Sequence, residues 1–270
     1  MTTADSMPEV PEQAERACYV YGIVSEPDDT DVLEKLPAVA DPDAEVRLVA
    51  QGGIAAIVSE VPLDRPLGTP EDLHAHAHVL DSLAASDLVV LPFRFGSVLP
   101  DDSAVIDELL ENGRDDFLRA VERLADQAQF TLRARYEEDA VLREVLEERE
   151  DIRKLREELV GVAAEAAHEG RIQLGELVSQ AVAEKRRVDA AAVEEHLMPF
   201  SAAVKSTEPA SADGVVDSAF LVEDSRRKEF EEAAEALARS WHGRVRFRLL
   251  GPVAAYDFVD DALSEPKGDR

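Results

Sequence analysis

The clearest alternation of apolar and polar residues in this chain lies near its C-terminus, at residues 244–250. One face of the predicted strand is apolar, and the other carries only arginine. The apolar side chains are Val245, Phe247 and Leu249, and the arginines are Arg244, Arg246 and Arg248. Gly251-Pro252 follows, and we expect it to end the strand pairing, because proline has no backbone N–H to donate. With the aromatic tail of Tyr256 and Phe258 behind it, we interpret this segment as structure and as recognition surface.

The first half of the chain has the element order strand, helix, strand, strand, helix, strand. Strands are predicted at 17–24, 45–50, 54–60 and 88–95, and helices at 30–36 and 69–85. The second helix has a well-formed start, since Thr69 can cap it and Pro70 suits its first turn. Two more helices, at 103–110 and 115–128, are expected on either side of Gly113.

The second half repeats this order. Strands are predicted at 130–136, 201–207, 215–222 and 244–250, and a helix at 225–240. A long helical stretch separates the first two strands, and we expect a break in it near Gly170. Two apolar seams in this stretch favour a helical hairpin over a coiled-coil arm, because they can face each other and span too few heptads for a coiled coil. The seams are Ile152, Leu155, Leu159 and Val162, and Leu174, Leu177, Val178 and Ala181.

These patterns predict an α+β fold of two ferredoxin-like (βαββαβ) domains in tandem, the second with an enlarged helical crossover. We expect an N-terminal α+β domain at 17–128 and a C-terminal ferredoxin-like domain at 129–261. The helical insertion of the second domain is expected at about 137–198. Residues 1–16 and 262–270 are expected to be flexible tails.

Composition limits the possible partners. Of the 270 residues, 45% are hydrophobic and 32% are charged, which is typical of a globular protein, and the net charge is −29. This negative charge excludes a general affinity for nucleic acid or for an anionic lipid membrane, because both need a basic surface. No apolar run reaches the ~20 residues of a membrane span. Cys18 is the only cysteine, and its apolar surroundings favour a buried, unreactive thiol in a cytoplasmic protein.

Few residues suggest catalysis or metal binding. His74 and His78 share a face of the predicted helix, as in a two-ligand zinc site, but further ligands would have to come from distant carboxylates. Gly52-Gly53 lacks the lysine of a phosphate-binding loop and is explained by a hairpin turn. No serine stands in a nucleophile elbow. We therefore predict no catalytic residue, no metal and no cofactor, and thus no enzyme.

The arginines suggest a different kind of surface. Arg133 and Arg135 lie on the polar face of the predicted strand 130–136. If this strand pairs with 244–250, five arginines gather on one sheet face, where like charges directly opposite each other are unfavourable. Carboxylates within the chain, such as those at 137–150, could neutralise them, or a partner could do so. The internal source is favoured, because arginine stems also cover apolar surface.

Several blocks of the sequence resemble the gas vesicle protein family GvpF/GvpL. They occur in order at 17–23, 53–59, 76–80 with His76, 91–98 with Arg94, Phe95 and Gly96, 138–142, and 251–259. The most specific is the block 91–98, Leu-Pro-Phe-Arg-Phe-Gly-Ser-Val. The resemblance is closer to the GvpF branch, with GvpL as the alternative.

The resemblance implies a non-enzymatic accessory protein of gas vesicle formation, located at the gas vesicle and in the cytoplasm. Such a protein binds the hydrophobic shell protein GvpA and other accessory gas vesicle proteins during assembly. The resemblance leaves open whether it stays in the vesicle as a minor component. Two alternatives remain: a small-molecule enzyme or sensor on a ferredoxin-like fold, and a general chaperone-like adaptor.

Two further expectations concern individual regions. We predict that Arg94 and Gly96 are structural, with Arg94 satisfying carbonyls or a carboxylate at the junction between the domains. We also predict that the second domain binds the shell protein through its arginines and aromatic tail, because such side chains dominate binding energy at interfaces. The first domain would mainly support the second.

Overall fold

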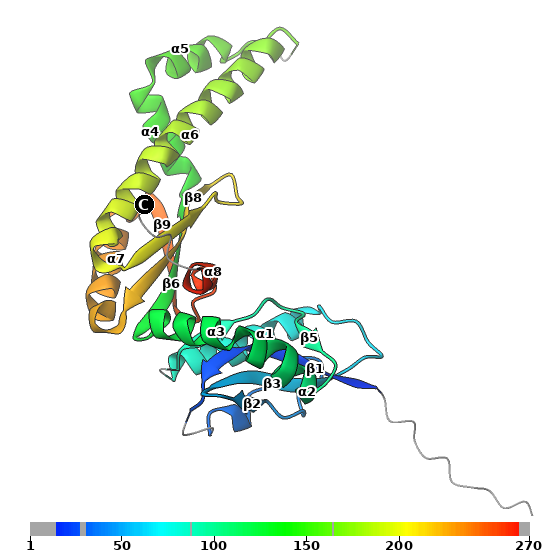
Figure 1. Ribbon diagram of the computed structural model, residues 1–270. Coiled ribbons are helices and arrows are strands. Elements are labelled where there is room, and N and C mark those ends of the chain that lie inside the picture. The colour runs from blue at the N-terminus through cyan, green and yellow to red at the C-terminus, as the bar shows by residue number, and fades with distance from the viewer. Residues whose placement is uncertain (1–14, 28–30, 87, 164, 265–270) are drawn as a thin grey trace, which may run out of the picture. The chain divides into compact units, whose positions relative to one another are not determined.

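The computed structural model describes residues 15–27, 31–86, 88–163 and 165–264. Its contacts divide the chain into two compact units (Figure 1). Unit 1 comprises residues 1–125 together with 259–270, and unit 2 comprises residues 126–258. The end of the chain thus returns to unit 1, whereas the sequence assigned residues up to 261 to the second domain. Each unit is described by itself below.

Unit 1 contains an antiparallel sheet that helices cover. Its strands are β1 (Arg16–Ser25), β2 (Arg47–Gln51), β3 (Ile54–Pro62), β4 (Val90–Pro92) and β5 (Val98–Leu99). The sheet order is β2-β3-β1-β4, all pairs are antiparallel, and β5 also pairs with β1. The helix expected at 30–36 is only a 3₁₀ turn, Leu33–Lys35, within the described residues. The first crossover of this unit is therefore almost without helix.

Helix α1 (Pro70–Ala85) starts where the sequence predicts. The Asp72 backbone N–H donates to the Thr69 hydroxyl at 3.2 Å, and the Thr69 N–H donates to the Asp72 carboxylate at 3.1 Å. This reciprocal capping box satisfies two backbone donors at the helix N-terminus. The predicted start of α1 is thus confirmed.

Helices cover both faces of the unit 1 sheet. Eight successive residues of β1, from Ala17 to Val24, are buried. Because successive strand residues point to opposite faces, such a run requires cover on both sides. The cover comes from α1 and from a continuous helical segment, α2 (Asp102–Ala104), the π-helical Val105–Leu110, and α3 (Glu111–Leu124). The predicted break at Gly113 is wrong, since that residue lies inside α3.

The last described residues complete unit 1. Helix α8 (Val259–Leu263) packs on α3, and the Arg123 guanidinium donates to the Ala262 carbonyl at 2.8 Å. Residues 262 and 263 are therefore helical, and Arg16 begins β1, which corrects both predicted tails at their inner ends. The rest of those tails, 1–14 and 265–270, lies outside the described residues.

Unit 2 repeats the strand order of unit 1. Its strands are β6 (Gln127–Tyr136), β7 (Ala203–Thr207), β8 (Gly214–Glu223) and β9 (Val245–Val253), in the antiparallel order β7-β8-β6-β9. In both sheets the first strand lies between the third and the fourth, as in a ferredoxin-like fold. The predicted α+β class is confirmed.

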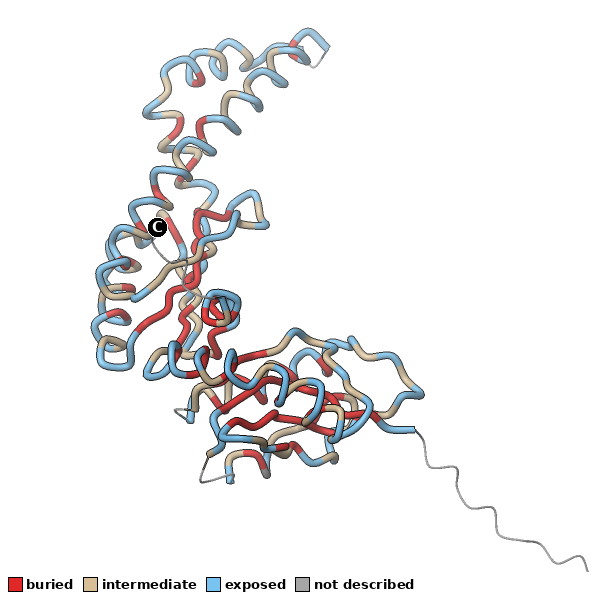
Figure 2. Tube along the Cα trace, viewed as in Figure 1, coloured by how far each residue is buried: buried red, intermediate tan, exposed pale blue. Residues whose placement is uncertain are grey.

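The core of unit 2 lies on one face of its sheet. Phe130, Leu132 and Ala134 of β6 are buried there against α6 (His168–Leu197) and α7 (Arg227–Ser240). The residues between them are more accessible, and Arg133 and Arg135 are exposed. From Phe130 to Tyr136, burial along β6 therefore alternates, whereas β1 is buried over eight successive residues (Figure 2).

The enlarged crossover is a helical hairpin, as the apolar seams predict. Helices α4 (Glu138–Glu148) and α5 (Glu150–Leu159) pack on α6 through a small cluster of Val145, Ile152 and Ala181. Figure 1 shows α5 and the adjoining part of α6 projecting beyond the sheet of their unit. Gly170 does not break the helix. It lies in the first turn of α6, where a Cβ would come within 2.6 Å of Leu159.

Candidate functional site

Four arginines meet on the face of the unit 2 sheet opposite its main core cluster. Strand β6 pairs with β9, so that Arg133 lies directly opposite Arg248, and Arg135 directly opposite Arg246. All four are exposed. The sequence-based expectation that these strands pair is thus confirmed. Like charges placed directly opposite each other destabilise a sheet unless something neutralises them.

Neutralisation from within the chain is partial. Arg133 lies 3.3 Å from the Asp217 carboxylate, and Arg246 donates to Glu137 at 2.7 Å. Within the described residues, Arg135 and Arg248 make no side-chain hydrogen bond or ion pair. The internal source of neutralisation, which the sequence favoured, therefore accounts for two of the four arginines.

A shallow pocket borders this arginine face. It has a volume of about 300 Å³ and lies between β6 and the loop that joins β7 to β8. Arg133 and Arg135 line one side, and Pro209 and Ser211 line the other. The face is therefore not flat but has a depression beside its charged residues.

The aromatic tail is a structural part of unit 2. The Gln129 side chain donates to the Asp257 carboxylate at 2.6 Å and accepts from the Asp257 N–H at 3.0 Å. Lys205 donates to the Asp257 carbonyl at 2.7 Å, and its ammonium lies 5.6 Å from the centre of the Phe258 ring. Phe258 is buried, whereas Tyr256 is 39% exposed. Of the two predicted aromatic anchors, only Tyr256 is therefore accessible to a partner.

Gly251-Pro252 does not end strand pairing. Strand β9 continues to Val253, which pairs with Gln129 across an irregularity in the register. Gly251 has φ +145°, and a Cβ there would come within 2.6 Å of the Phe130 ring. Only glycine fits this close approach without displacement, so this position is structural.

Arg244 does not join the arginine face. Its guanidinium lies on the helical side, where it donates to Glu144 at 2.7 Å and to Asp189 at 2.5 Å and stacks 4.9 Å from the Trp241 ring. The Tyr136 hydroxyl also donates to Asp189. Burial acts to raise the pKa of Glu144, but hydrogen bonds from Arg244 and Lys185 outweigh it, and the pKa is lowered. Arg244 thus ties β9 to α4 and α6, and the predicted set of five arginines is reduced to four.

In unit 1, His76 belongs to a buried hydrogen-bond network. Its Nδ1 lies 2.9 Å from the Tyr19 hydroxyl, which accepts from the Gly96 N–H at 3.2 Å. Burial lowers the pKa of His76, and a hydrogen bond with the backbone of Phe93 opposes this shift. His76 is therefore neutral near pH 7, and the network holds the segment 93–97 in place.

Arg94 and its two neighbours, Phe95 and Gly96, differ in their surroundings. Phe95 packs against the rings of Tyr19 and His76, at 6.0 and 5.6 Å between centroids. Gly96 has φ +91°, which favours glycine, and its structural role is as expected. The Arg94 side chain is exposed and has no hydrogen bond or ion pair in the part of the chain that the structure describes. The prediction that it satisfies carbonyls or a carboxylate at the junction between the domains stays a prediction.

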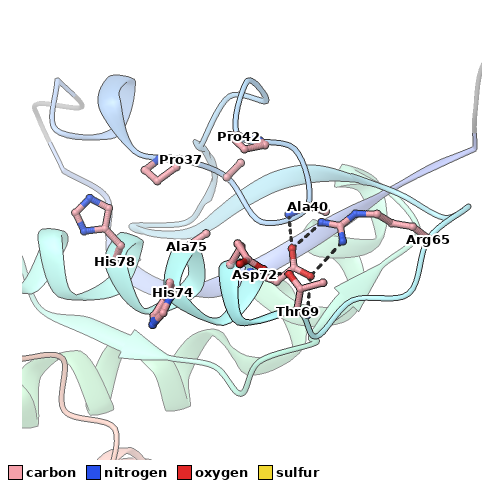
Figure 3. Close-up of a pocket in the computed structure, with 11 residues that line it drawn as sticks. Pro37, Ala40, Pro42, Arg65, Thr69, Asp72, His74, Ala75 and His78 are labelled. Atoms are coloured by element: carbon pink, nitrogen blue, oxygen red, sulfur yellow. Dashed lines mark hydrogen bonds and ion pairs between the residues drawn. The ribbon is translucent and has the colours of Figure 1, made fainter.

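A pocket of about 580 Å³ in unit 1 lies between α1 and the segment 37–42 (Figure 3). Its charged residue Asp72 accepts from Arg65 at 2.6 Å, from Gly68 at 3.0 Å and from Ala40 at 3.2 Å. Burial alone would raise the pKa of Asp72, but these donors and Thr69 lower it to about 2. Asp72 and Arg65 are thus occupied with each other, which leaves mainly apolar lining.

His74 and His78 lie at this pocket as exposed side chains. Within the described ranges, no group of three or more His, Cys, Asp or Glu side chains could hold a metal ion. Cys18 is buried as predicted, and burial raises the pKa of its thiol to about 12. It is therefore a protonated, unreactive thiol.

Comparison with known proteins identifies the family of this chain. The family model described as gas vesicle synthesis protein GvpL/GvpF matches residues 17–260. The chain belongs to this family. It is 34% identical over 243 residues to gas vesicle protein F of a Streptomyces species, a match that covers 90% of this chain and 99% of that protein. Gas vesicle protein F of Dolichospermum flosaquae is 24% identical and matches over 75% of this chain and 82% of its own length.

Two crystal structures of GvpL/GvpF relatives have the same fold. GvpF from an Anabaena species superposes with a TM-score of 0.75 at 21% identity, and GvpF from Microcystis aeruginosa with 0.72 at 20% identity. Each match covers 90% of this chain and 98% of the other. Membership in the GvpL/GvpF family confirms the resemblance seen in the sequence and supports a role in gas vesicle formation. No helix among the described residues is long and apolar enough to cross a membrane.

Sequence reasoning missed two clusters of this GvpL/GvpF protein. The first is the Arg65–Asp72 ion pair. The sequence indicates Asp72 only as an acidic residue in the first turn of a helix, and no pattern indicates Arg65 as its partner. The link from Tyr19 to His76 joins residues 57 positions apart. The only sign of it in the sequence is one polar group in each of two apolar segments, the hydroxyl of Tyr19 and the imidazole of His76. No local pattern connects the two.

Proposed function

We propose that this protein is a non-enzymatic accessory protein that binds the gas vesicle shell protein GvpA, and other accessory gas vesicle proteins, during vesicle assembly in the cytoplasm. Its family membership and its likeness to gas vesicle protein F over nearly its whole length support the proposal. The binding surface lies in unit 2, and unit 1 mainly supports it.

One observation carries this assignment to unit 2. The main core of the unit 2 sheet lies on one face, and four exposed arginines stand on the other. Among the described residues of unit 1, β1 has no comparable face, because its residues are buried on both sides. Arginine is enriched at the centres of protein interfaces, where its planar group makes several directed contacts.

A small-molecule sensor or enzyme is less well supported. The pocket of unit 1 is concave, but its buried carboxylate already accepts from Arg65 and from backbone N–H groups. A ligand site usually presents convergent polar groups that are free to bind. Here those of Asp72 and Arg65 are used to hold the loop 65–69 against α1.

The experiment that tests the proposal is a pull-down of GvpA. The immobilised full-length protein should retain GvpA, and residues 126–258 alone should do so if their circular dichroism spectrum shows that they fold. An unrelated protein of similar negative charge serves as control. Retention by unit 1 with none by folded unit 2 would reverse the assignment, and no retention by the full chain would reject it.

A further inference from the structure

The four arginines form a compact grid of positive charge. Neighbours across the strands have Cβ atoms about 5 Å apart. Neighbours along one strand, such as Arg133 and Arg135, are about 7 Å apart. Residues 126–258 hold 19 of the 29 lysines and arginines of the chain but only 28 of its 58 acidic residues. Positive charge is thus concentrated in unit 2, and four of its arginines lie side by side on the open face.

Among the described residues of unit 2, the contacts of the four arginines do not account for the grid as a stabilising feature. Arg133 faces Arg248, and Arg135 faces Arg246, so each pair repels across the ladder. Asp217 and Glu137 each neutralise one arginine, and the exposed fractions of Arg133 and Arg246 are still 52% and 76%. The pKa of Asp213 is lowered mainly by a hydrogen bond from Ser211, with only a smaller effect of Arg135. The chain therefore keeps an uncompensated positive surface although its net charge is −29.

We propose that this arginine face, formed by Arg133, Arg135, Arg246 and Arg248, binds a carboxylate-rich segment of a partner protein. The inference rests on the proposed function, in which that partner is a gas vesicle protein. Guanidinium groups bind carboxylates through paired hydrogen bonds, and such charge-assisted bonds are stronger than neutral ones. The grid spacing fits acidic side chains on alternate residues of an extended segment, which are also about 7 Å apart. The pocket beside Arg133 and Arg135 gives the segment a recess in which to lie.

A protein segment fits this face better than a nucleic acid. A polyanion of many phosphates would be repelled by the acidic remainder of the chain. Asp217 and Glu137 also border the arginines. A long polyanion would be repelled by these two carboxylates, whereas a short acidic segment can contact the arginines alone. A second copy of this chain is acidic enough to compete, and the experiment separates it from a foreign partner.

The test uses the full-length chain with Arg135→Gln and Arg248→Gln together. These two residues have no side-chain partner within the described residues, so no ion pair is lost. Removing them also relieves the repulsion with Arg246 and Arg133, and the melting temperature should stay the same or rise. The matched control is Arg153→Gln with Arg156→Gln, two exposed arginines of α5 in the same unit. Arg248→Glu, which places opposite charge across from Arg133, is the second variant.

Binding is measured with two probes, a fluorescent glutamate-rich peptide and GvpA. We expect the double variant to bind both at least tenfold more weakly, Arg248→Glu to bind the peptide more weakly still, and the control to stay within twofold of the wild type. Added salt should weaken peptide binding. Undiminished binding by folded double variant, or an equal loss in the control, would overturn the inference. So would tighter binding of single-stranded DNA than of the peptide.

The outcomes also separate this inference from the proposed function. If the wild type retains GvpA and the double variant retains it equally well, the arginine face is not the site although GvpA binding stands. If the wild type binds the peptide through the face but not GvpA, the proposed function fails and the acidic partner is another protein. A dimer of the wild type that the double variant loses, seen by light scattering, would assign the face to a second copy and overturn the inference.

Discussion

The two sheets of this protein have the same strand order but differ in what covers them. In unit 1 the helices that follow β4 return to the sheet, so that β1 is buried on both faces. In unit 2 the extra helices enter between the first two strands and form a hairpin of their own, which packs partly on itself. The face of β6 and β9 opposite the core cluster carries exposed arginine instead. Two sheets with the same strand order can thus differ in exposure. The point in the chain at which extra helices are inserted determines whether both faces of the sheet are buried.

The largest expected effect on stability comes from a charge placed in the buried sheet of unit 1. Ile57 of β3 is fully buried, and Ile57→Arg would place an unpaired charge in a covered sheet. We expect a loss of more than about 4 kcal/mol in the free energy of unfolding, enough to unfold unit 1. Arg248→Ala on the open face is the counterpart and should change it by less than about 0.5 kcal/mol. Urea unfolding followed by circular dichroism measures both, and similar losses would contradict the difference between the sheets.

The next largest effect on stability is expected at Arg244, whose role differs from that of the exposed arginines. Arg244→Ala removes the guanidinium that Asp189 and Glu144 share in a largely buried site, and leaves them with Tyr136 and Lys185. Removing one member of such a pair is destabilising, here by about 2 kcal/mol after allowance for partial exposure. Arg239, an exposed residue of α7 paired with Glu235, is the control and should cost less than about 0.5 kcal/mol. Thermal melting of both variants decides, and equal melting temperatures would remove Arg244 from the structural network.

A pH effect of similar size concerns Asp72. Its folded-state pKa of about 2 lies below the ordinary value of 3.8, so the ionised carboxylate stabilises unit 1 above about pH 4. This contribution, about 2 kcal/mol, is lost as the pH falls from 4 towards 2. Asp72→Asn should be less stable at pH 7 by a similar amount and should lose less on acidification. Urea unfolding at a series of pH values measures this, and an unchanged pH profile in the variant would contradict it.

The smallest expected effect on stability concerns Arg94. Because its side chain is exposed and has no partner among the described residues, Arg94→Ala should change the melting temperature by less than about 2 °C. Tyr19→Phe, which removes the hydrogen bonds to His76 and Gly96, should lower stability by about 1 kcal/mol. A large loss in Arg94→Ala would restore the structural role that the sequence suggested.

Sequence reasoning reached the fold because the strands are written in local patterns. The apolar run 17–24 and the alternation at 130–136 and 244–250 gave the strands, and the second pattern also indicated that one face of that sheet is polar. The sequence pattern could not place Arg244. This residue stands just before β9, and its side chain points to the helices, where its partners Glu144 and Asp189 are more than 50 residues away in the chain. Nor could the pattern show that 254–258 covers Gln129, since that contact depends on β9 continuing past Pro252.

The central claim is that the open face of unit 2, and not unit 1, contacts the shell protein. A photo-crosslinking amino acid at position 248 of the arginine face, compared with one at the exposed position 73 of α1, tests it most directly. With GvpA present, we expect a cross-linked product from position 248 and none from position 73. A product from position 73 with none from position 248 would contradict the account.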